Sequence, residues 1–163
     1  KVSFDRRLSV LSSVTHAALN YMFSMLIFAV FSLYYGNIPD LVHVGLYFYF
    51  LVLLILLILG ISLILSILVI SFRDLSSIWE VLISVLFYLS PIFYPMQIVP
   101  QKWLAIYLLN PLTVIITNMR YVIVNKDLSN LIPSWPLLIE VIVVLGFGTV
   151  YFNHHAKRVV EKI

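Results

Sequence analysis

The sequence predicts an all-α fold: a polytopic integral membrane bundle of helices, with short re-entrant gate helices at its outer face. Three observations lead to this prediction. Of the 163 residues, 63% are hydrophobic and 10% are charged, whereas a soluble domain has about 25% charged residues. The apolar residues form long unbroken runs, which are typical of spanning helices and not of a membrane barrel. Three prolines within residues 87–100 then predict a break, because proline removes a backbone donor.

The first helices follow from the order of polar and apolar residues. Residues 1–13, KVSFDRRLSVLSS, place Phe4, Leu8 and Leu11 on one helical stripe beside basic residues, so we expect an amphipathic cytosolic segment. A first span is predicted over 14–35, before the turn residues at 36–40. A second span is predicted over 41–72. It is longer than the hydrocarbon requires and should tilt or project.

The predicted third span, 76–94, contains the break. Its apolar run follows Arg73-Asp74 and reaches Pro91 and Pro95 after too few residues to cross the hydrocarbon. We therefore expect the helix to end or bend at these prolines. Non-helical backbone within the hydrocarbon needs protein or water around it, so we expect the residues at the break to be covered by other helices or to lie beside water.

Residues 95–124 are predicted to form a re-entrant gate, interrupted at Asn110 and Pro111. If this region returns to the side it came from, seven lysines and arginines share the cytosolic side and three lie opposite (Lys1, Arg6, Arg7, Arg73, Lys157, Arg158 and Lys162 against Lys102, Arg120 and Lys126). A full crossing gives six against four, so the positive-inside rule favours re-entry. A last span over 135–153 and a cytosolic tail over 154–163 complete a single transmembrane domain, 1–163.

Several of these motifs, taken in order, resemble a known family. RDL at 73–75 is followed by FYLSPIFYP at 87–95, IVP at 98–100, NP at 110–111 and then Arg120. This order resembles the membrane subunit of type-2 ABC exporters, particularly permeases that export polysaccharides and polyol phosphates, such as O-antigen, capsule and teichoic acid. The resemblance covers only the later part of a typical six-span member. The chain is therefore expected to be a carboxy-terminal part.

The resemblance implies a role for the start of the chain. Residues 1–13 are similar to the cytosolic coupling region of those permeases, although Asp5 and Val10 stand where the family prefers proline. The residues implied to dock onto an ATPase subunit are Lys1, Phe4, Asp5, Arg6 and Arg7. The residues alone favour a different interpretation, a basic anchor on anionic lipid.

Aromatic residues are the candidates for a translocation path. Aromatic rings can stack on the C–H faces of sugars, and tyrosines can form hydrogen bonds with sugar hydroxyls. The six candidates in the second and third spans and at the break are Tyr47, Tyr49, Phe87, Tyr88, Phe93 and Tyr94. The alternative is an aromatic belt at the membrane interface with ordinary helix packing. The resemblance further implies that Pro91, Pro95, Asn110 and Pro111 are the breaks of an outer gate.

Charges in or near the hydrocarbon need a reason. Arg120 and Glu140 are expected either to form a pair that stabilises the gate or to be solvated separately at the interface. The four histidines do not gather with other ligands, so no metal site is predicted. The phosphate-binding motif G-x-x-x-x-G-K-[ST] does not occur in these residues, so the chain is not expected to hydrolyse ATP by itself.

The predicted function is that of a permease subunit, not an enzyme. It would belong to an ABC exporter that moves a lipid-linked polysaccharide or related glycopolymer across a bacterial or archaeal inner (plasma) membrane. Expected partners are ABC ATPase subunits holding ATP and magnesium, a second permease copy in a homodimer, the lipid-linked glycan and membrane lipids. No nucleic acid is expected as a partner, and no cofactor in this chain. Two alternatives stay open: a membrane-embedded enzyme acting on lipid-linked sugars, and a non-catalytic membrane scaffold.

Overall fold

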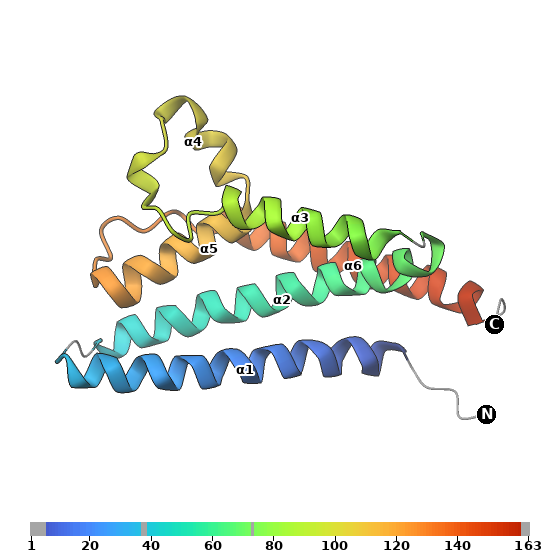
Figure 1. Cartoon of the computed structure of the whole chain (residues 1–163), viewed down its shortest axis with the longest axis horizontal. Helices are drawn as coiled ribbons and strands as arrows, with labels where there is room; N and C mark the ends of the chain where they lie inside the picture. Colours follow the sequence, from blue (N-terminus) through green and yellow to red (C-terminus); the bar gives the residue numbers. More distant parts are fainter. Residues whose placement is uncertain (1–5, 37–38, 73, 161–163) are drawn as a thin grey trace.

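The computed structural model describes residues 6–36, 39–72 and 74–160, which form helices joined by short connections. The three longest helices are α1 (Arg6–Tyr34), α2 (Leu41–Ser71) and α6 (Trp135–Val160), and each contains a stretch long and apolar enough to cross a bilayer. They lie along the long axis of the molecule. The start of α1 and the end of α6 share one end of this axis, opposite the α1–α2 connection (Figure 1). The predicted all-α membrane bundle is confirmed.

Helix α1 joins two regions that the sequence predicts to be separate. From Arg6 it runs without a break to Tyr34, so the described part of residues 1–13 is not a separate interfacial helix. No proline or glycine lies between Arg6 and Tyr34, and nothing local ends the helix before the span. At its far end Gly36 adopts a left-handed φ of 68°, and its amide donates to the carbonyl of Leu33, which closes the helix.

Helices α2 and α6 form the frame of the bundle. They approach most closely where Gly60 meets Gly148, since a Cβ added to Gly148 would lie 2.5 Å from the Gly60 carbonyl oxygen. Small residues permit this kind of approach between membrane helices. The buried core beside this contact includes Phe50, Leu53 and Leu57 of α2, Leu137 and Val141 of α6, and Ile115 and Val122.

Helix α3 (Leu75–Leu89) is shorter than the predicted third span. Its 15 residues rise about 22 Å, against about 30 Å of hydrocarbon. The helix ends just before Pro91, which has no amide to continue it, so the prediction of helix over 90–94 is wrong. None of the residues of α3 is buried within the described chain.

The rest of the length of α2 is passed by α5 (Pro111–Arg120) and the π-helical turn η2 (Tyr121–Asn125). We refer to α3, α5 and η2 together as the broken crossing. Helix α3 starts at the end of α2 and runs back beside it, and α5 continues in the same direction toward the α1–α2 connection (Figure 1). Ser90 and Leu112 line one groove together with Leu57, which lies near the middle of α2. The chain therefore passes α2 in two pieces, with the junction at mid-length.

Two short elements lie between these pieces: the 3-10 turn η1 (Met96–Ile98) and helix α4 (Gln101–Leu108). They project to one side of the bundle (Figure 1). The axes of α4 and of α5 with η2 differ by 103° across Asn110. By length and composition such a pair is either a broken span or a re-entrant loop. Re-entry of residues 95–124 from the outer face therefore stays a prediction.

Helix α6 extends beyond the predicted last span, 135–153. It continues to Val160, so the described part of the predicted tail, 154–160, is helical. Phe147, Tyr151 and His155 follow one another at four-residue spacing, with ring centroids 5.7 Å and 4.3 Å apart. Stacking along one helical face favours this continuation past the apolar stretch.

Candidate functional site

The end of α3 and the start of α5 meet in a small polar junction. Ser90 and Pro91 are both buried there. Asn110 caps α5: its Oδ1 accepts a hydrogen bond from the amide of Leu112 at 3.0 Å, and its Nδ2 donates to Oγ of Ser90 at 3.3 Å. Pro111 occupies the first turn of α5, where its missing amide leaves no bond unmade. The two breaks predicted from the sequence, at Pro91 and at Asn110-Pro111, therefore form one structure.

Arg120 holds the loop that follows α3. Its guanidinium donates to the carbonyl oxygens of Pro91 at 2.8 Å, Ile92 at 2.6 Å and Tyr94 at 3.1 Å. Hydrogen bonds to a charged group contribute about 1.5–3 kcal/mol each when partly buried. The last turn of α5 is thus tied to the first residues after α3.

The expected pair of Arg120 and Glu140 is not formed. Among the described residues no carboxylate lies within ion-pair distance of Arg120, whose donors go to backbone carbonyls instead. Oε2 of Glu140 is buried and has no hydrogen-bond partner in the described part of the chain. The prediction fails because it matched side-chain charges and left out the carbonyls that a proline break exposes.

A second polar contact fixes the other side of α5. Asn118 is fully buried, and its side chain pairs with both backbone groups of Ile132: Oδ1 accepts from the amide at 2.8 Å and Nδ2 donates to the carbonyl at 3.1 Å. Sequence reasoning assigned no role to this asparagine. A lone amide within an apolar segment was the available signal, because a buried amide needs partners.

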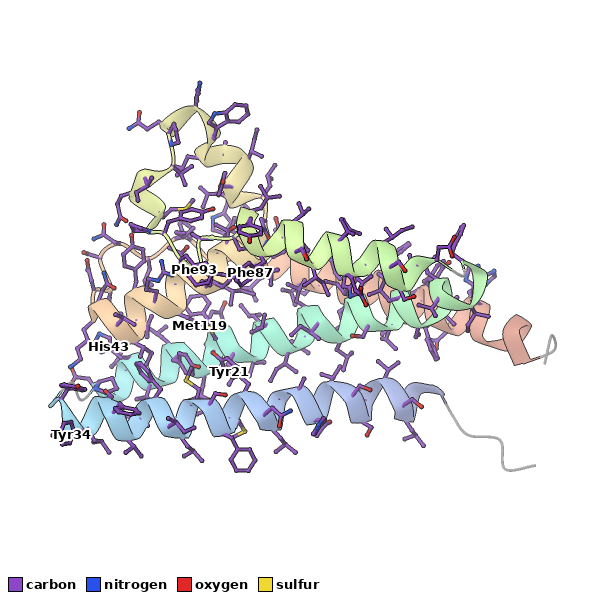
Figure 2. The ribbon with its side chains drawn as sticks, viewed as in Figure 1. Tyr21, Tyr34, His43, Phe87, Phe93 and Met119 are labelled. Atoms are coloured by element: carbon purple, nitrogen blue, oxygen red, sulfur yellow. The ribbon has the colours of Figure 1, made fainter. Side chains whose placement is uncertain are left out.

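The aromatic candidates separate into two groups. Phe87 and Phe93 lie beside each other at the end of α3, with centroids 5.2 Å apart (Figure 2). Tyr88 is 75% exposed beside Phe87, and its carbonyl accepts a hydrogen bond from the hydroxyl of Tyr94 at 3.1 Å. These four candidates surround the break.

The other two aromatic candidates lie in the core. Tyr47 is 7% exposed, and its hydroxyl lies 2.7 Å from that of Tyr21 on α1. Figure 2 shows Tyr21 on α1 and Met119 on α5, and the Tyr21 hydroxyl lies 4.0 Å from the Met119 sulfur. Tyr47 also lines a hollow between α1 and α2, so its role in a path stays a prediction. Tyr49 is half-buried against the same core, and its role stays a prediction.

A further aromatic hollow lies on the projecting elements. It has a volume of about 460 Å³ and is lined by Tyr94, Trp103 and Tyr107 together with the 98–100 turn. Trp103 and Tyr107 were not among the predicted site residues. They lie on α4, four residues apart, and the turn that includes η1 connects Tyr94 to this helix.

Two other predictions have different outcomes. Lys1, Phe4 and Asp5, and the side chains of Arg6 and Arg7, lie outside the described residues, so the coupling role stays a prediction. Within the described ranges, no group of three or more His, Cys, Asp or Glu side chains gathers as a metal site would require. The candidate site is therefore the polar junction of Asn110 and Arg120, with the exposed rings of Tyr88 and Phe93 beside it.

Comparison with known proteins places the chain in a family. Residues 6–124 match the family model described as ABC-2 type transporter. The chain belongs to the ABC-2 type transporter family. Two proteins from Klebsiella pneumoniae named O-antigen export system permease protein RfbA are each 30% identical to it over 79% of this chain and 50% of the relative. A protein of that name from Myxococcus xanthus is 24% identical over 100% of this chain and 63% of the relative.

The ABC-2 match includes α3, α5 and η2 up to its last residue but one. It begins at Arg6, the first described residue of α1, and ends at Val124 in η2, so α6 lies beyond it. The resemblance read from RDL, FYLSPIFYP and NP is confirmed. The chain spans about half the length of the Klebsiella relatives. The polar junction of this ABC-2 chain lies within the half that is compared.

Proposed function

We propose that this chain is the membrane permease part of an ABC exporter that moves a lipid-linked polysaccharide, or a related glycopolymer, outward across a bacterial or archaeal inner membrane. Membership of the ABC-2 family supports the transport class. The names of the three relatives support an O-antigen-like substrate. The single observation that carries the proposal is the break at the middle of α2, where hydrogen bonds from Asn110 and Arg120 join α5 to the end of α3.

The path is proposed to run along the side where α3 ends. The break lies beside the middle of α2, which is itself a candidate span, and we propose that its non-helical backbone lies at hydrocarbon depth. Such backbone is stable only when it is covered by protein or lies beside water. Phe87, Tyr88, Phe93 and Tyr94 are on this side and offer rings to passing sugars.

The energy is proposed to come from a separate ATPase that binds ATP and magnesium, while this chain binds no cofactor. The continuity of α1 supports a direct mechanical connection, because its 29 residues join the basic start to the first span without a hinge. A force applied near Arg6 would move the whole helix. A second copy of the permease is proposed to complete the path, since none of the residues of α3 is buried by the described chain.

The proposal is tested with the full-length permease and its ATPase in proteoliposomes, measuring ATP-dependent transfer of lipid-linked polysaccharide. Replacing both Arg6 and Arg7 with Glu should leave membrane insertion intact and uncouple ATP hydrolysis from transfer. Lys102→Glu is the matched charge reversal on the projecting α4 and should leave coupling unchanged. If the protein captures no ATPase and transfers no glycan, the exporter proposal is wrong.

Topology is tested separately. These 163 residues contain no cysteine, so Lys126→Cys gives one label after η2 once any cysteine elsewhere in the full-length protein is replaced by serine. An impermeant maleimide added to sealed vesicles should react with it from the side opposite the cytosol. Reaction only from the cytosolic side would contradict the re-entrant arrangement and the outward path.

A further inference from the structure

The loop after α3 has an excess of hydrogen-bond acceptors. The last carbonyls of any helix have no partner within it. Here the next residues include Pro91 and Pro95, which contribute carbonyls and no amides. The loop lies beside the middle of α2, and at the membrane depth proposed above unpaired carbonyls are costly. The break therefore needs a donor from elsewhere in the molecule.

Arg120 is the donor that the fold supplies. It reaches back from the last turn of α5, and its two terminal nitrogens contact the carbonyls of Pro91, Ile92 and Tyr94. Only arginine offers several donors in one rigid plane; lysine would present a compact charge on a flexible chain. The cation also lies at the carboxyl ends of α3 and of α5, where the helix dipoles favour positive charge.

The other contacts across the break are weaker. Asn110 donates to Ser90 at 3.3 Å, the hydroxyls of Tyr94 and Tyr107 lie 3.4 Å apart, and Nε2 of Gln97 donates to the Tyr121 hydroxyl at 3.0 Å, so all three are contacts between neutral groups. The Arg120 bonds are charge-assisted, and those to Pro91 and Ile92 are also shorter. Separating α3 from α5 therefore depends mainly on one side chain.

We propose that Arg120 is the positioning residue that keeps this break closed: its guanidinium holds the 91–94 loop against α5, and the gate opens when water replaces the three carbonyls. The gating role of Arg120 rests on the proposed export function, because a gate requires a transported substrate. The closed contact itself is a property of the chain, which can be measured without ATP or substrate.

The test uses the absence of cysteine from these 163 residues, with any cysteine elsewhere in the full-length protein replaced by serine. Ile92→Cys then places one thiol in the clamped loop and keeps the carbonyl that Arg120 contacts. The full-length protein in proteoliposomes is labelled with a small methanethiosulfonate without ATP, in the presence and absence of Arg120→Gln. We expect labelling to be about tenfold faster in the Gln variant, since a single charge-assisted hydrogen bond is worth at least that factor. Arg120→Lys should give an intermediate rate.

Two controls separate a gate latch from a packing residue. Val122→Cys, on the fully buried face two residues after Arg120, should label slowly with or without Arg120→Gln. Lys102→Gln removes a cation that lies over the Trp103 ring and should not change labelling at position 92. Faster labelling at both 92 and 122 would mean that Arg120 only supports packing. An unchanged rate at 92 would overturn the latch outright, whatever the outcome of the transport assay.

Discussion

The frame made by α2 and α6 and the broken crossing made by α3 and α5 pass the same length of the bundle by different means. Helices α2 and α6 are continuous, and they meet through glycines at backbone distance. Helix α3 stops at mid-length and buries none of its residues within the described chain. Its connection to α5 is made by the side chains of Asn110 and Arg120.

This difference separates stability from movement. Lipid tails can replace apolar side-chain contacts but cannot fill the close backbone contact at Gly60 and Gly148, so the frame has one favourable arrangement. Hydrogen bonds from Arg120 to carbonyls can be exchanged for bonds to water when water reaches the loop, at a cost of about 1.5–3 kcal/mol each. Helix α5 belongs to both regions, because it packs against α2 and also holds the end of α3. The following variants should unfold the frame or move the break, but not both.

The largest expected effect is from Asn118→Leu. Asn118 is fully buried and satisfies both backbone groups of Ile132, so leucine leaves two buried groups unpaired at about 1–3 kcal/mol each. Thermal unfolding of the purified protein in detergent should show a loss of this size. Asn20→Leu makes the same change at an exposed position of α1 and should be nearly neutral. Equal stability of the two variants would mean that Asn118 does not anchor α5.

The next effect is at the glycine contact of the frame. Gly148→Ala would place a methyl group 2.5 Å from the Gly60 carbonyl oxygen and force α2 and α6 apart, at about 1–3 kcal/mol. Gly146→Ala has open space and should stabilise α6 slightly, because alanine favours helix. The free energy of unfolding should therefore fall in Gly148→Ala and rise slightly in Gly146→Ala when both are measured in the same way. A stabilising Gly148→Ala would show that the two helices do not approach this closely.

Most of the frame could be predicted from the sequence. Gly36 and the run from Leu41 fix the ends of α1 and α2 closely, because turn residues and long apolar runs are local signals. The predicted boundary between residues 6–13 and the first span is wrong, because α1 continues through it. The residues become less polar at this point, but their helical propensity does not change. The end of α3 was expected at Pro91 or beyond. Pro91 predicts where α3 is interrupted, but it does not predict whether the helix continues after the interruption.

The polar junction was predicted only in its parts. Pro91, Asn110, Pro111 and Arg120 were each expected to matter, yet their meeting depends on α5 continuing the path of α3 beside α2. That arrangement is set by tertiary packing, which no spacing along the chain reveals. The Arg120–Glu140 pair was wrong for the same reason, because the carbonyls of residues 91–94 are a competing partner visible only in the fold.

Replacing Pro91 and Pro95 together with Ala is expected to affect the break and spare the frame. Alanine restores two amide donors and lets α3 extend, so the exposed carbonyls can be satisfied within the helix. The unfolding temperature should change little. ATP-dependent transport should fall about tenfold, which corresponds to about 1.4 kcal/mol in the balance of open and closed states. Full transport by this variant would mean that the prolines are packing features only.

The smallest expected effect concerns the loop between η2 and α6, on the fixed side of α5. Hydrogen bonds from Ser129 and Asn130 hold the pKa of the exposed Asp127 below its usual range. A lowered pKa in the folded state means that the carboxylate stabilises the loop above the pKa of the unfolded chain, about 3.9, and that this contribution is lost as the pH falls through the folded value. The Ser129 amide bonds to Asp127 at 2.9 Å and reports on this contact.

Hydrogen exchange of the Ser129 amide, corrected for its intrinsic rate, should therefore be constant between about pH 5 and 8 and faster below about pH 4. Asp127→Ala should remove the protection at every pH, because no acceptor replaces the carboxylate. The Ile92→Cys labelling rate should stay the same in that variant, since the loop after η2 and the loop after α3 contact opposite sides of α5 through different side chains. A changed labelling rate at position 92 would mean that the loop after η2 and the loop after α3 move together, and that α5 moves with the gate.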